Sequence, residues 1–210
     1  MTFGQLTERM PPEGVFRSGQ ILAGERAPAH VRRQIDRWVK AGRLIRLRRG
    51  VYMLNRPWIR EFPHPFVVAN VLVKASYVTL HSALSHYGMI PEAVPVTTSL
   101  TTGRPEALET PVGRFQYRHV HPRLFDGFTD SEVAPGQHAL IARPEKALVD
   151  LLYLTPDSDD TNYFRALRVE PPAGTSPDTF LARLYSSANS SRSAKVERAV
   201  RQLSDLWSSE

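Results

Sequence analysis

Arginine side chains crowd one short stretch of the chain, between residues 28 and 54. Guanidinium groups form paired hydrogen bonds with phosphate and with the edge of guanine, so such a cluster is typical of proteins that bind DNA. We predict that eight residues of this stretch bind DNA: His30, Arg32, Arg33, Arg37, Arg43, Arg46, Arg48 and Arg49. The simpler alternative is a solvated basic helix on a protein that binds no nucleic acid.

The elements that must position these side chains are a helix and a hairpin. The first half of PAHVRRQIDRWVKAGRLIRLRRGVYML repeats apolar residues with the spacing of one helix face: Val31, Ile35, Trp38 and Val39. Pro28 suits the first helical turn, and Gly42 suits the left-handed residue that follows a helix. A two-stranded hairpin then turns at Gly50. This order is that of a winged helix-turn-helix, whose third helix enters the major groove while its hairpin, the wing, reaches flanking phosphates.

The charge of the chain is divided unevenly. Residues 1–60 hold 13 Lys/Arg against 4 Asp/Glu, a net charge of +9, whereas residues 61–210 hold 14 against 17, a net charge of −3. A basic N-terminal end points to a polyanionic partner. Two short helices are expected before the basic helix, over residues 2–9 and 18–24. We therefore predict a winged helix-turn-helix domain over residues 1–57 and a second domain over residues 58–210.

The second domain mixes helical and strand patterns. Helices are predicted over 66–75, 78–88, 144–154, 177–187 and 194–207, and strands over 96–102, 114–120 and 136–142. We interpret residues 155–176 as a loop-rich segment and residues 186–193 as a flexible, serine-rich turn. The predicted fold class is α+β, with the winged helix-turn-helix followed by an α/β C-terminal domain that has a small mixed sheet and flanking helices.

The pattern of histidines and carboxylates favours no active site. His81 and His86 are five residues apart, about 140° around a helix, which is a poor spacing for a shared metal. His119 and His121 lie on or beside one strand, and the roles of these four histidines stay open. The aspartates between 157 and 160 read as an exposed acidic loop. Without a phosphate-binding loop or a dinucleotide fingerprint, we predict no catalytic residue, no metal and no cofactor.

The amino-acid composition also indicates the cellular compartment in which the protein is expected. The chain has no cysteine, which excludes disulfides and thiolate metal sites and fits a reducing cytosol. Its first residues lack the apolar core of a signal peptide, and no run of about 18 apolar residues could cross a membrane. A cytoplasmic protein with no membrane partner is expected.

Two sets of residues carry a family resemblance. The segment GRLIRLRRGVYML (42–54) has a glycine at its start and then a hairpin signature, at Leu44, Arg46, Arg49, Gly50 and Tyr52. Residues 76–128 and 141–154 add a helix that leads to Gly88, a Pro-Glu turn and the run Glu145-Lys146-Ala147-Leu148 with Asp150. In this order, the segments resemble the AbiEi family of type IV toxin–antitoxin antitoxins.

The resemblance implies an antitoxin with two activities. Its winged helix would bind double-stranded operator DNA and repress its own operon, and its C-terminal domain would counteract a cognate nucleotidyltransferase-like toxin. Two alternatives remain open from the residues alone. One is a winged-helix transcription regulator whose C-terminal domain senses a small ligand, with no toxin, and the other is an enzyme that acts on nucleic acid through the histidine-bearing central region.

Overall fold

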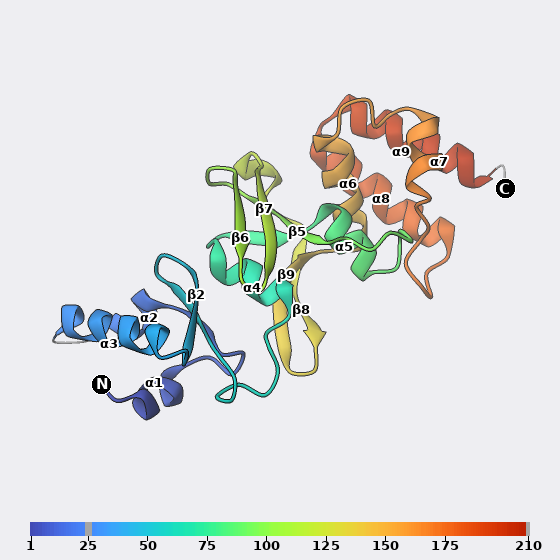
Figure 1. Cartoon of the computed structure of the whole chain (residues 1–210). Helices are drawn as coiled ribbons and strands as arrows, with labels where there is room; N and C mark the ends of the chain where they lie inside the picture. The colour runs from blue at the N-terminus through green and yellow to red at the C-terminus, as the bar shows by residue number, and fades with distance from the viewer. Residues whose placement is uncertain (24–26, 209–210) are drawn as a thin grey trace.

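The computed structural model describes residues 1–23 and 27–208, which form three parts in a row (Figure 1). Short helices with a small sheet lie at one end, a six-stranded sheet occupies the middle, and a group of helices lies at the other end. The two termini therefore lie at opposite ends of the molecule. This mixture of helix and sheet, with a winged N-terminal part, confirms the predicted α+β class.

The described residues of the N-terminal part form three helices and three strands. In chain order they are α1 (Phe3–Arg9), β1 (Val15–Arg17), α2 (Ser18–Leu22), α3 (Pro28–Lys40), β2 (Leu44–Arg48) and β3 (Val51–Leu54). The predicted helices and the hairpin are present, and the expected end of the second helix at Gly24 lies outside the described residues. The prediction omitted β1, which pairs antiparallel with β3 to give the order β1-β3-β2. Three residues are too few to show strand alternation in a sequence.

The ends of α3 and of the hairpin follow from residue type. Pro28 occupies the first turn of α3, where a missing N–H leaves no hydrogen bond unmade. Gly42 ends the helix with φ +69° and Gly50 turns the hairpin with φ +81°, both in the left-handed region. Val31 and Ile35 are buried, so the opposite face of α3 is left to solvent.

The small sheet packs on both of its faces. One face meets α1, α2 and α3 in a cluster that includes Phe16 and Tyr52. The other face contributes Val15, Leu47 and Met53 to the hydrophobic core that continues through α4 (Pro65–Leu72) into the central sheet. The wing is therefore fixed against the middle of the molecule by apolar packing.

The central sheet is mixed and has the order β6-β7-β5-β4-β9-β8. Its elements are β4 (Ser76–Val78), α5 (Leu80–His86), β5 (Val96–Thr101), β6 (Glu106–Thr110), β7 (Gly113–His119), the 3-10 turn η1 (Pro122–Leu124), β8 (Phe128–Ala134) and β9 (Gln137–Ala142). The predicted strands over 96–102 and 114–120 are present as β5 and β7, which pair in parallel. Strands β4, β6 and β8 were not predicted. The helix expected from residue 78 begins at Leu80, because the residues before Thr79 form β4.

Four helices follow the central sheet in the described residues: α6 (Pro144–Leu154), α7 (Thr161–Leu167), α8 (Pro177–Ser191) and α9 (Ala194–Ser208). Two expectations were wrong here. The loop-rich segment contains α7, whose first turn is capped when the Asp160 carboxylate accepts the Asn162 N–H. The expected turn after residue 186 is instead the last part of α8, because Ala188 and Ser191 are buried there.

Candidate nucleic-acid interface

The solvent face of α3 carries the helical half of the predicted DNA-binding residues. His30, Arg33 and Arg37 are spaced i, i+3 and i+7, so they lie on one face, and all three are exposed. Arg32 is also exposed, beside this face. Within the described residues, none of these four side chains has a hydrogen bond or an ion pair with the protein. They are free to meet a partner.

The arginines at the foot of the hairpin are held by neighbours. Arg46 of β2 forms a hydrogen-bonded ion pair with Asp36 of α3, and its guanidinium lies 5.6 Å from the centre of the Tyr52 ring. Arg43 lies over two aromatic rings, 5.3 Å from the centre of Phe3 and 5.6 Å from that of Trp58. These contacts fix where two of the eight predicted residues point, and the first one joins the helix to the wing.

The two arginines near the tip of the wing lie in different surroundings. Arg48 donates to a carboxylate oxygen of Glu106 in the central sheet at 2.9 Å and, more weakly, to the carbonyl of Leu72 at 3.4 Å. Arg49 is exposed and has no hydrogen bond or ion pair with any described residue. The structure thus places Arg48 on the side of the wing that faces the central sheet.

A cavity of about 440 Å³ lies between α3 and the wing. Three of the predicted residues, Arg32, Arg46 and Arg49, line it together with Asp36, Tyr52 and Ser18. Residues that are far apart in the sequence therefore gather around one hollow, as a bound phosphate would require. Sequence reasoning overlooked Asp36, although an acid inside an arginine-rich helix was a visible signal.

The histidines that the sequence left open lie apart from this interface. His119 forms a hydrogen bond through Nδ1 with the carbonyl of Gly103 at 2.9 Å, and His121 accepts the N–H of Arg123 at 3.2 Å. His86 packs against the rings of Phe66 and Tyr87. Across residues 1–23 and 27–208, no three or more histidine, aspartate or glutamate side chains are grouped so that they could hold a metal ion.

Burial gives one of these histidines a measurable effect on stability. It lowers the pKa of His86 below the ordinary value of 6.5. The unfolded chain therefore binds a proton at His86 more readily than the folded protein does. The contribution of the neutral His86 to the free energy of unfolding is fully present above about pH 6.5 and is lost as the pH falls below it. We expect His86→Gln to reduce the fall in melting temperature between about pH 7 and pH 5. His30→Gln, at an exposed position, is the matched control, and equal slopes in all three proteins would contradict the assignment.

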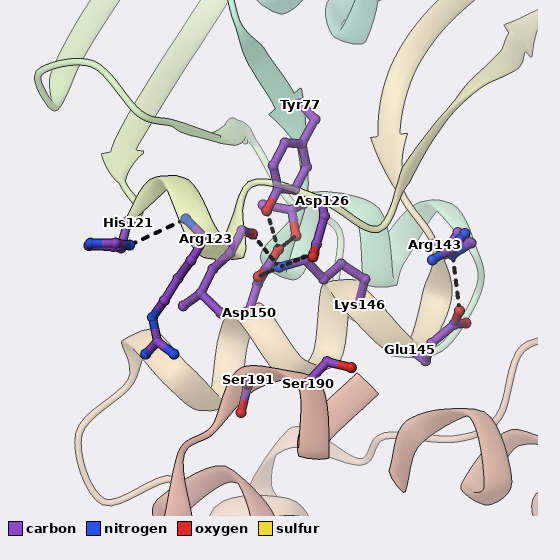
Figure 2. Close-up of polar contacts among 12 residues, drawn as sticks. Tyr77, His121, Arg123, Asp126, Arg143, Glu145, Lys146, Asp150, Ser190 and Ser191 are labelled. Atoms are coloured by element: carbon purple, nitrogen blue, oxygen red, sulfur yellow. Dashed lines mark hydrogen bonds and ion pairs between the residues drawn. The ribbon is translucent and has the colours of Figure 1, made fainter. Parts of the chain in front are cut away.

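The central sheet and α6 meet at a buried polar network (Figure 2). The Asp150 carboxylate accepts hydrogen bonds from the Tyr77 hydroxyl at 3.0 Å, the Thr79 hydroxyl at 2.9 Å and the Lys146 ammonium at 2.5 Å. Lys146 also donates to the carbonyl of Leu124 at 2.9 Å. Every charge in this network is met by a partner, so it is suited to joining β4, η1 and α6. Thr79 occupies the N-cap of α5, but its hydroxyl donates to Asp150 and does not cap the helix.

A comparison with known protein families gives a match in the N-terminal part of the chain. Residues 13–55, which contain the small sheet, α2 and α3, match the family model described as "Transcriptional regulator, AbiEi antitoxin". The AbiEi resemblance is confirmed over this segment. The match includes every predicted DNA-binding residue, so the helix and wing described above lie within the segment that is similar to this regulator family.

The comparisons across the rest of the chain are more distant. One similar solved structure is that of the RV2827C protein from Mycobacterium tuberculosis, with 14% sequence identity and a TM-score of 0.46 over 95% of this chain and 79% of that chain. No curated protein matches the chain. In the part of the chain that the structure describes, no helix is both long and apolar enough to cross a membrane.

Proposed function

We propose that the chain is an antitoxin that represses its own operon by binding operator DNA and that counteracts a cognate nucleotidyltransferase-like toxin. The observation that carries the proposal is the free basic face of α3, with His30, Arg33 and Arg37, inside the segment that matches the AbiEi regulator family. The remaining alternatives, a ligand-sensing regulator and an enzyme, have no comparable observation in their favour.

In the DNA-binding half, α3 is the recognition helix. Its 13 residues give a length of about 20 Å, which suits the major groove. Arg33 and Arg37 would meet base edges there, with Arg32 and His30 near the adjoining phosphates. The wing would supply Arg43, Arg46, Arg48 and Arg49 to the flanking backbone. Because most of these contacts are to phosphate, the affinity should fall steeply as salt rises.

In the other half, we assign the activity against the toxin to residues 58–210, and the winged helix-turn-helix to residues 1–57. The antitoxin acts in the cytoplasm by binding and not by catalysis. Support comes from the family match and from the resemblance of residues 76–128 and 141–154 to the body of AbiEi antitoxins. The folded sheet and helices there provide a surface that is separate from the basic face of α3 (Figure 1).

One experiment tests both halves. The chain is expressed with and without a neighbouring nucleotidyltransferase-like gene, and a reporter is placed under the DNA immediately upstream of its own coding sequence. We expect the chain to lower reporter output and to restore the growth that the neighbouring gene inhibits. A chain that rescues growth but never binds the upstream duplex would contradict the repressor half, and the reverse result would contradict the antitoxin half.

A further inference from the structure

A second cavity, of about 630 Å³, lies on the other side of the wing, between the hairpin and the central sheet. The charged residues that line it are mostly positive, with four cations and one carboxylate: Arg17, Arg48, Arg49, Lys74 and Glu106. The cations come from three places, namely β1, the wing and the segment after α4. The fold therefore brings together positive charges that the sequence keeps far apart.

The carboxylate in this cavity is already engaged. Glu106 pairs with Arg48 at 2.9 Å, and each side chain is about one-third exposed, at 32% and 34%. The other three cations have no ion pair with any described residue. Burial and the nearby Arg48 lower the pKa of Arg17, as expected where cations lie close together without enough counter-charge. An anion that entered the cavity would relieve this repulsion.

The cavity adjoins the proposed DNA interface at the tip of the wing. Arg49 and Gly50, at the tip of the wing, line both this cavity and the one between α3 and the wing. A nucleic-acid backbone that follows the wing around its tip would pass from one hollow into the other. Phosphates are spaced regularly along such a backbone, so a second site at this position suits DNA better than an isolated small anion.

We propose that this cavity is a second binding site for a phosphate of the DNA backbone. In the free protein Arg48 pairs with the Glu106 carboxylate, and on DNA binding the phosphate replaces that carboxylate. The proposal rests on the proposed DNA-binding function and deepens it. Arg48 then exchanges one charge-assisted hydrogen bond for another. Since Glu106 belongs to β6, the exchange releases the ion pair that ties the wing to the central sheet. DNA binding and this contact between the two parts therefore compete.

Removal of the competing carboxylate tests the proposal. We expect Glu106→Gln to bind the duplex immediately upstream of the chain's own coding sequence about threefold to tenfold more tightly, because Arg48 no longer has to leave an ion pair. In an Arg48→Ala background the same substitution should have no effect. Glu109→Gln, which removes an exposed acid from the same strand, is the matched control for simple loss of negative charge.

A second variant tests the same proposal if Glu106→Gln disturbs folding. Lys74→Ala should weaken binding, and the slope of log affinity against log salt should become shallower by about 0.9, the value for one lost phosphate contact. Arg165→Ala, at an exposed position of α7, removes the same charge far from the wing and serves as its control. Thermal unfolding of each variant checks that it is folded.

The outcomes separate this inference from the proposed function. If Glu106→Gln leaves affinity unchanged, or raises it equally in the Arg48→Ala background, the competition does not exist. If Lys74→Ala behaves like Arg165→Ala, the cavity holds no phosphate. Either result overturns the inference alone provided that Arg33→Ala weakens binding. Loss of all DNA binding by the unmodified chain would instead overturn the proposed function.

Discussion

Replacement of Lys146 by methionine is expected to lower the free energy of unfolding by about 3–5 kcal/mol, the usual effect of removing one partner from a buried ion pair. Methionine fills a similar volume, so the loss comes from charge and not from a cavity. Asp150, which is only 3% exposed, would keep its negative charge in an apolar surrounding. The Tyr77 and Thr79 hydroxyls would remain as its hydrogen-bond donors.

The pH dependence of this variant provides a second measurement. Burial raises the pKa of Asp150, and the Lys146 ammonium opposes that rise, so the pKa is higher still when the ammonium is removed. An acid whose folded pKa exceeds its unfolded value makes the protein less stable as the pH rises from the lower value to the higher. The destabilisation by Lys146→Met should therefore be smaller at about pH 5 than at about pH 7 when both are measured by urea unfolding.

Two further variants identify the cause. Lys146→Met combined with Asp150→Asn removes the stranded charge but keeps an oxygen that accepts from Tyr77 and Thr79, so it should recover part of the stability. Arg143→Met removes an exposed arginine that pairs with the partly buried Glu145 at 3.3 Å, and it should change stability by about 1 kcal/mol at most. A loss of that small size for Lys146→Met as well would show that the pair does not stabilise the fold.

The elements of the DNA-binding part were accessible from the sequence because each has a local signal. Apolar spacing defines α3, and two glycines in left-handed conformation, Gly42 and Gly50, mark the ends of the helix and of the first strand of the hairpin. The strand β1 has no such signal, because its three residues become a strand only when β3 lies beside them. The same holds for β4, which lies between two long partners.

Strands at the edges of the central sheet escaped prediction for a different reason. Strands β6 and β8 lie at the two edges, and their side chains are mostly exposed or only partly buried. Alternation of apolar and polar residues needs one buried face, so a polar edge strand has almost no pattern. The continuation of α8 was missed because serines are weak helix formers. Tertiary burial of Ala188 and Ser191 outweighs that propensity.

Residue type indicated which side chains could meet DNA, but not what holds them in the free protein. The ion pair of Arg46 with Asp36 spans ten residues and connects two predicted elements, so it could have been considered. The pair of Arg48 with Glu106 spans 58 residues and ends on a strand that the sequence did not reveal. Long-range pairs of this kind depend on the topology of the sheet, which local patterns do not determine.

The largest effect on DNA binding is expected for Arg33 and Arg37, the two arginines at the centre of the exposed α3 face. Each good contact with a base edge contributes about 1–3 kcal/mol of discrimination, which corresponds to a loss of roughly tenfold to 100-fold for either alanine substitution. Neither side chain has a partner in the free protein within the described residues, so their removal should leave stability almost unchanged. The loss can therefore be assigned to the interface, with Arg165→Ala as the control for net charge.

The choice of DNA distinguishes two ways in which these arginines can act. Affinity is measured for the upstream duplex and for a random duplex of equal length, each over a series of salt concentrations. If Arg33 reads a base, Arg33→Ala loses more affinity for the upstream duplex than for the random one. If it meets only phosphate, both affinities fall alike and the salt slope becomes shallower by about 0.9. Unchanged affinity for both duplexes in the Arg33→Ala, Arg37→Ala double variant would show that α3 is not the recognition helix.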